Sequence, residues 1–121
     1  MNFSRLILET GMGNDLYGED YTKAACRAVQ DAIHHSSITM FRSLKLDSER
    51  MQVKVFVGVV KPNLVDIEAV RKILPHGIVS VNVVRGGLNI DDPENGTISV
   101  IATAAVEALY EIDKSNFIKN G

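Results

Sequence analysis

Strict alternation of apolar and polar positions from Met51 to Val59 constrains the fold of this chain more than any other feature. Every second residue is Met or Val, while Gln52, Lys54 and Phe56 lie between them. Side chains of a β-strand point in turn to the two faces of its sheet. The segment therefore predicts a strand whose continuous apolar face packs against the core.

A helical period appears on either side of this strand. Before it, Asp20 is placed to cap a helix that extends to about His34 or His35. After it, Asn63 or Asp66 can cap a shorter helix that ends before residues 75–77. The first helix has one apolar face at 3.6-residue spacing, formed by Tyr21, Ala24, Ala25, Ala28, Val29 and Ala32.

Three further strands complete the predicted order βαβαββ. They cover Phe3 to Glu9, Ile78 to Val84, and Thr97 to about Ala108, although the second half of the last segment also fits helical spacing. The residues from Asp91 to Gly96 read as a turn-rich connection. We expect an α+β two-layer sandwich, with a four-stranded mixed sheet and two helices on one face. The uncovered apolar face predicts a homo-oligomer.

Length and composition place the chain among ordinary globular proteins. Its 121 residues fit one domain over 1–113, followed by a loose tail over 114–121. With 13 basic and 15 acidic side chains and no basic cluster, nucleic acid is not an expected partner. No apolar run approaches the roughly 20 residues that span a bilayer, so no membrane is expected. A single cysteine, Cys26, and the lack of a secretory signal favour the cytoplasm.

The segment GMGNDLYGEDYTKAA, residues 11–25, is the strongest candidate for a functional site. Its glycine spacing does not fit a dinucleotide or phosphate loop, and its carboxylates disfavour an anion. Asp15 and Tyr17 point the same way in an extended segment, and Glu9 can join them. Such a set can bind a divalent ion, or can act as a general base with the phenol as proton donor. The structural alternative is that the glycines supply positive φ angles, Asp20 caps the helix and Tyr17 packs.

This segment resembles the signature Gly-x-Gly-x-Asp-x-His-Gly of an uncharacterised family of conserved hypothetical proteins. The matching residues of the signature are Gly11, Gly13, Asp15 and Gly18, and Tyr17 stands where the family has histidine. A phenol titrates near 10 and an imidazole near 6.5, so a proton shuttle at this position would be altered. The likeness continues at 20–25, at 75–77 and at 84–88, and it carries no established activity.

A more distant resemblance links the chain to one third of the cyanuric acid hydrolases and barbiturases, which open cyclic amides. It rests on the run from Asp20 to Lys23. Those enzymes hold three similar domains around a central site, so a homotrimer would imitate their plan. Their catalytic lysine falls near Gly11 here, and the Ser-Lys pair is therefore not supported.

Other residues of the sequence also admit both a functional and a structural interpretation. Arg85 before Gly86 and Gly87 can grip a carboxylate of a ligand or of a neighbouring subunit, or can simply follow a hairpin bend. The pair His34-His35 and His76 fit helix ends better than metal ligands, and Cys26 fits inert packing.

The expected function is binding or hydrolysis of a small polar, possibly heterocyclic metabolite near subunit interfaces. The alternative is a non-catalytic assembly module whose glycine loop serves the interface. Cofactors stay open and no metal ligands are assigned. Asp15 and Tyr17 carry the chemistry, and the expected ligand-binding residues are Glu9, Gly11, Gly13, Gly18, Asp20, Thr22, Lys23, Arg85, Gly86 and Gly87.

Overall fold

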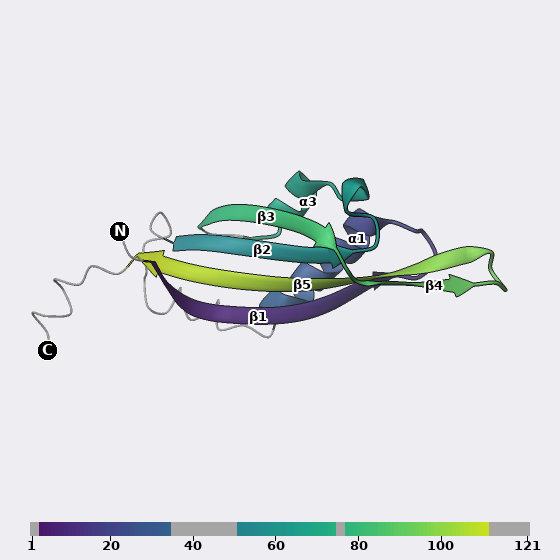
Figure 1. The fold of residues 1–121 in the computed structure, drawn as a ribbon, viewed down its shortest axis with the longest axis horizontal. Coiled ribbons are helices and arrows are strands. Elements are labelled where there is room, and N and C mark those ends of the chain that lie inside the picture. The colour runs from purple at the N-terminus through teal and green to yellow at the C-terminus, as the bar shows by residue number, and fades with distance from the viewer. Residues whose placement is uncertain (1–2, 35–50, 75–76, 112–121) are drawn as a thin grey trace, which may run out of the picture.

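The structure, a computed structural model, describes residues 3–34, 51–74 and 77–111 (Figure 1). The expectations for His35, for His76 and for the tail over 114–121 lie outside these residues. In chain order the elements are β1 (Phe3–Asp15), α1 (Tyr21–His34), β2 (Met51–Val59), η2 (Pro62–Leu64), α3 (Ile67–Arg71), β3 (Ile78–Arg85), β4 (Leu88–Asp92) and β5 (Thr97–Glu111).

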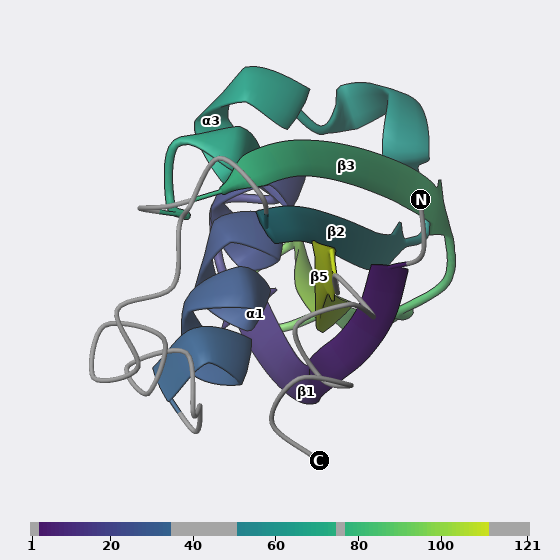
Figure 2. The same cartoon turned by 90° about the vertical axis from the view of Figure 1, so that its left-hand side faces the viewer.

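One mixed sheet forms the framework, in the order β1-β5-β2-β3, and β4 pairs with the first residues of β5. The β2 and β3 strands run parallel, and every other pair is antiparallel. The α+β class and the mixed sheet are thus confirmed, with five strands instead of four. Both helices lie on the same side of the sheet (Figure 2), as expected.

The additional strand lies where a loop was predicted. Residues 88–92 pair with 97–101 of β5, so the turn of the hairpin is only four residues long. Gly96 in this turn has a φ of 65°, a left-handed conformation that favours glycine. The prediction missed β4 because it is short and exposed, and because two aspartates at its end are uncommon in strands.

The outer bounds of two strands were also wrong. β1 continues past Glu9 to Asp15, so Gly11 and Gly13 belong to a strand and not to a loop. β5 continues to Glu111, which rules out the helical reading of its second half. Both strands are long because they pair with each other from Phe3 opposite Glu111 to Asp15 opposite Val100.

The core lies between the sheet and the helices. Asp20 caps α1 by accepting a hydrogen bond from the Lys23 amide at 2.9 Å, and Asp66 caps α3 by accepting from the Glu68 amide at 3.0 Å. The apolar face predicted for α1 is the buried one. It packs on fully buried strand residues from the alternating face of β2 and from β5, among them Val55, Val57, Val59, Val100, Ala102 and Val106.

Two glycines of β1 allow α1 to approach the sheet very closely. An ideal Cβ atom on Gly11 would lie 2.4 Å from the Ala32 nitrogen, and one on Gly13 would lie 2.2 Å from the Ala28 nitrogen. Any side chain at these positions would therefore overlap the helix backbone. Neither residue has a positive φ, nor has Gly18, so the suggested role of these glycines in positive-φ turns is wrong.

The opposite face of the sheet, here called the open face, has no helix among the described residues. Strand register assigns its residues, because partners in neighbouring strands point to the same face. One row contains Met12, Thr103, Gly58 and Val84, and the next contains Thr10, Ala105, Phe56 and Asn82. Seven large apolar side chains are exposed on this face: Leu8, Met12, Phe56, Ile78, Val84, Leu88 and Ile90.

Candidate functional site

The turn between β1 and α1, residues 16–20, is organised around Asp15. The Asp15 side chain is only 10% exposed. Its Oδ2 accepts a hydrogen bond from the Asp20 amide at 2.9 Å, and its Oδ1 lies 3.7 Å from the Arg27 guanidinium. A Cβ atom on Gly18 would lie 2.6 Å from Asp15 Oδ2, so the glycine leaves room for this carboxylate. Asp15 therefore holds the turn in its observed shape.

Two more hydrogen bonds fasten the β1–α1 turn to β5. Glu19, which has a φ of 52°, accepts from the Ile98 amide at 2.9 Å through Oε1. The Ser99 hydroxyl donates to the carbonyl of Leu16 at 3.2 Å. Between these contacts the side chains of Leu16 and Tyr17 are 44% and 66% exposed. A well-anchored turn thus presents an aliphatic and an aromatic side chain to solvent.

The remaining residues predicted at the helix start make structural contacts. The Thr22 hydroxyl accepts from the Asp66 amide at 2.8 Å and joins the start of α1 to the start of α3. Lys23 is exposed, and Glu9 is half-buried on the face of β1 that meets α1. The structure does not bring these three side chains together with Tyr17.

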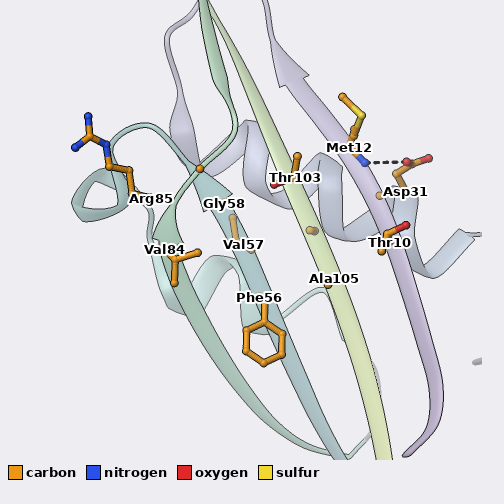
Figure 3. Close-up of a pocket in the computed structure, with 13 residues that line it drawn as sticks. Thr10, Met12, Asp31, Phe56, Val57, Gly58, Val84, Arg85, Thr103 and Ala105 are labelled. Atoms are coloured by element: carbon orange, nitrogen blue, oxygen red, sulfur yellow. Dashed lines mark hydrogen bonds between the residues drawn. The ribbon is translucent and has the colours of Figure 1, made fainter.

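The described residues form a hollow on the open face of the sheet (Figure 3). Its volume is about 700 Å³, within the range of small-molecule sites. Its floor is formed by small residues of β5 and β2, namely Thr103, Ala105 and Gly58, and Met12 and Phe56 rise beside them. We call this feature the open-face hollow.

Adjacent glycines deepen the open-face hollow at the end of β2. A Cβ atom on Gly86 would lie 3.3 Å from the Gly58 Cα atom, and one on Gly58 would lie 2.8 Å from the Thr103 hydroxyl. Gly87 follows with a φ of 65°, and a Cβ there would lie 2.3 Å from the Ile101 carbonyl oxygen. The bend therefore requires glycine at position 87 and turns the chain from β3 into β4.

The polar groups of the open-face hollow are few. Figure 3 shows the hydroxyls of Thr10 and Thr103, and it shows the Arg85 side chain at the rim with its guanidinium directed away from the centre. On the outer edge of β1, the Met12 amide donates to Asp31 of α1 at 3.0 Å. The hollow is therefore mostly apolar, with two hydroxyl groups from neighbouring strands and with the charged side chains of Arg85 and Asp31 on opposite sides of its rim.

Three residues predicted to bind ligand line the open-face hollow: Gly11, Arg85 and Gly86. Asp15 and Tyr17 are not among its lining residues. The prediction missed Thr10, Met12, Phe56, Gly58 and Thr103, which belong to the side of the strands that faces away from the core. One signal was available, because Gly58 replaces a side chain in an otherwise regular alternation.

Metal and thiol chemistry find little support in the described part of the chain. No group of three His, Cys, Asp or Glu side chains in residues 3–34, 51–74 and 77–111 is arranged to hold a metal ion. Burial, followed by the charges of Asp20 and Asp66, raises the pKa of the Cys26 thiol above its ordinary value. A smaller fraction of thiolate makes Cys26 a weaker nucleophile at neutral pH, which agrees with a packing role.

Within residues 3–34, 51–74 and 77–111, no helix is long and apolar enough to cross a membrane.

Comparison with known proteins assigns the chain to a family. A family model described as a conserved hypothetical protein, Lin0512, matches residues 5–108. The chain belongs to the Lin0512 family. A solved structure similar to this member is that of an FtsZ-like protein of unknown function from Nostoc punctiforme. The two chains share 37% identity with a TM-score of 0.78, over 93% of this chain and 99% of the other.

The comparisons supply no activity for this Lin0512 protein. No curated protein matches the chain, and both the family and the solved relative are described without a function. The expected membership of an uncharacterised conserved family is thus confirmed. The resemblance to cyclic amide hydrolases, and the roles given to Asp15 and Tyr17, stay predictions.

Proposed function

We propose that this Lin0512 protein binds a small, planar, uncharged heterocyclic molecule in the open-face hollow. The observation that carries the proposal is the depression of about 700 Å³ over the small residues of the central strands. A sheet surface is normally covered by its own side chains, so a depression of this size requires several small residues together. Here Gly58, Gly86 and Ala105 supply them.

The chemistry of the lining favours a flat ligand with a few hydrogen-bonding groups. The floor of Ala105, Thr103 and Gly58 accommodates a ring that lies on the sheet, and the Phe56 ring provides an aromatic contact at its side. The hydroxyls of Thr10 and Thr103 can each donate one hydrogen bond and accept others. A heterocycle with ring nitrogens and carbonyl oxygens offers the matching groups. The proposal covers binding alone, because Asp15 and Tyr17 lie outside the hollow.

A filling substitution tests the proposal. Ala105→Leu extends a side chain from the floor of the hollow, whereas Ser80→Leu adds a comparable apolar group to an exposed position of β3 on the same face. Uracil, thymine and hydantoin, which are uncharged at neutral pH, serve as probes, with binding measured by isothermal titration calorimetry and by the shift in melting temperature. We expect at least one probe to bind the unmodified protein and the Ser80→Leu variant, with binding lost in Ala105→Leu.

Two outcomes would count against a ligand site in the hollow. The first is that none of the probes binds and that native mass spectrometry of freshly purified protein detects no retained small molecule. The second is that a probe binds Ala105→Leu as tightly as it binds the Ser80→Leu control. The second result would move the site elsewhere on the molecule.

A second candidate function is assembly of identical subunits through the open face. The observation behind it is the group of seven exposed apolar side chains on that face, of which Met12 and Ile78 are each 61% exposed. Large exposed apolar patches mark interaction surfaces. We expect light scattering after size-exclusion chromatography to report more than one subunit, and we expect Ile78→Lys to reduce that number. A monomeric parent protein at micromolar concentration would refute assembly.

A further inference from the structure

We infer that Tyr17 of a neighbouring copy of this chain forms the missing wall of the open-face hollow. The inference rests on the proposed ligand site and names the partner that completes it. It draws on three separate features: an anchored turn that displays an aromatic ring, a depression that is open on one side, and opposite charges beside each of them.

The β1–α1 turn is built as a projection and not as a packed corner. Asp15, Glu19 and Ser99 each contribute a hydrogen bond that fixes it, yet the Tyr17 side chain is 66% exposed. No hydrogen bond to the Tyr17 hydroxyl exists within the described residues. A rigid turn loses little conformational entropy on association, and tyrosine is enriched among residues that dominate interface energy. Such a turn suits insertion into a partner.

The open-face hollow offers the complementary surface. Phe56 and Met12 stand beside its floor, where a tyrosine ring can make an edge-to-face contact with one and a sulfur contact with the other. Its volume of about 700 Å³ leaves space for a small ligand under such a ring. The phenol would then meet the ligand as a hydrogen-bond donor. This arrangement gives Tyr17 the donor role that the sequence suggests, at a site between two copies.

Charge distribution favours the same pairing. Tyr17 is followed by the exposed carboxylates Glu19 and Asp20. The rim of the hollow carries Arg85, which is exposed, has its guanidinium directed to solvent and forms no ion pair within the described residues. The acidic flank of the turn would therefore face the Arg85 side of the rim, away from Asp31 on the opposite side. Complementary charges of this kind orient partners and accelerate their encounter.

The contact is heterologous, because the turn of one copy meets a different surface of the next. Contacts of this type close into rings or continue into filaments. A ring of three copies would match the homotrimer that the resemblance to cyclic amide hydrolases implies. Each copy would then give one tyrosine and receive one.

Disulfide trapping between differently mutated copies tests the inference directly. In a Cys26→Ser background, one preparation carries Tyr17→Cys and a second, with a size tag, carries Val84→Cys, which lies beside the hollow. After mixing and mild oxidation, we expect a covalent dimer that contains one copy of each kind. Leu64→Cys provides the control, because Leu64 is 52% exposed on η2, and it should form no such product with Val84→Cys.

Association measurements add a second readout that does not depend on cysteine. We expect Tyr17→Ala to weaken self-association roughly thirtyfold, as for truncation of an aromatic hot-spot residue. Arg85→Glu should weaken it in a salt-dependent way, whereas Lys72→Glu on an exposed position should not. Equal melting temperatures of the variants at low concentration confirm that each still folds.

The outcomes separate this inference from the ligand proposal. Absence of the mixed disulfide, together with unchanged association in Tyr17→Ala, overturns the contribution of Tyr17 even if a heterocycle binds. Formation of the mixed disulfide upholds it even if none of the heterocyclic probes binds, in which case only the ligand proposal fails.

Discussion

Substitution of Gly13 by alanine tests the close approach of α1 to β1. The new methyl group would begin 2.2 Å from the Ala28 nitrogen and 2.5 Å from the Ala24 carbonyl oxygen. Ordinary contacts begin at 3.4 Å, so α1 must retreat by roughly 1.2 Å, the difference from 2.2 Å. The obstructing atoms belong to the helix backbone, and no side-chain rotation can relieve the overlap.

The expected loss of stability follows from this displacement. Overpacking of a core costs about 1–3 kcal/mol, and a gap of 0.5–1 Å forfeits a quarter to a half of the dispersion energy of the contacts that it opens. Alanine also lowers the conformational entropy of the unfolded chain, which stabilises the folded state by about 0.4–1 kcal/mol. Because the overlap is with backbone atoms, we take the overpacking cost at its upper end, about 3 kcal/mol, and after subtraction of about 0.4–1 kcal/mol we expect the free energy of unfolding to fall by about 2–2.6 kcal/mol. For a domain of this length, that loss lowers the melting temperature by roughly 8–12 °C.

Urea denaturation followed by circular dichroism measures the free energy of unfolding, and calorimetry measures the melting temperature. Gly86→Ala is the matched control, because its Cβ atom would lie 3.3 Å from one backbone atom and its φ lies outside the left-handed region. We expect this control to remain within about 1 kcal/mol of the parent protein. The reasoning is refuted if Gly13→Ala is as stable as Gly86→Ala.

Three further predictions concern the turn, the helix junction and the thiol. Asp15→Ala leaves the Asp20 amide without its acceptor and should lower the free energy of unfolding by about 1–3 kcal/mol in urea; an unchanged midpoint would contradict the anchoring role of Asp15. Thr22→Val removes the acceptor of the Asp66 amide and should cost about 1 kcal/mol, with Thr22→Ser recovering most of it; equal losses in both variants would point to packing instead. Because burial raises the pKa of Cys26, iodoacetamide at pH 8 should react more slowly with the folded protein than with the urea-unfolded chain, and equal rates would show that the thiol is not shielded.

The elements with a regular apolar period could be predicted from the sequence. α1 begins at Tyr21 and β2 covers Met51–Val59, as the spacing indicates, because burial of one face imposes a period on the residues. The β4 strand could not be predicted in this way. Only Leu88 and Ile90 alternate with polar residues in it, which is too short a pattern to identify a strand, and its place depends on pairing with β5.

The glycine-rich segment shows why a site is harder to predict than a strand. Gly11 and Gly13 suggest a ligand loop, yet the space that they leave open is filled by the backbone of α1. A glycine in sequence indicates only that something approaches closely, whether helix, turn or ligand. The open-face hollow depends on Thr10, Thr103 and Gly58 from three strands, and the register that joins them appears only in the folded sheet.

The position of β5 in the chain has a consequence for biosynthesis. β1 and β4 have no other strand partner in the described sheet, and β2 meets β1 only across β5. Yet β5 is the last of the described strands in chain order, so it is the last of them to leave the ribosome. The nascent chain must therefore carry α1 and three incompletely paired strands, β1, β2 and β4, until residues 97–111 emerge, with a closure from Phe3 to Glu111 still to be made. Translation of residues 97–111, and not the appearance of the first helix, would set the moment at which the described sheet can close.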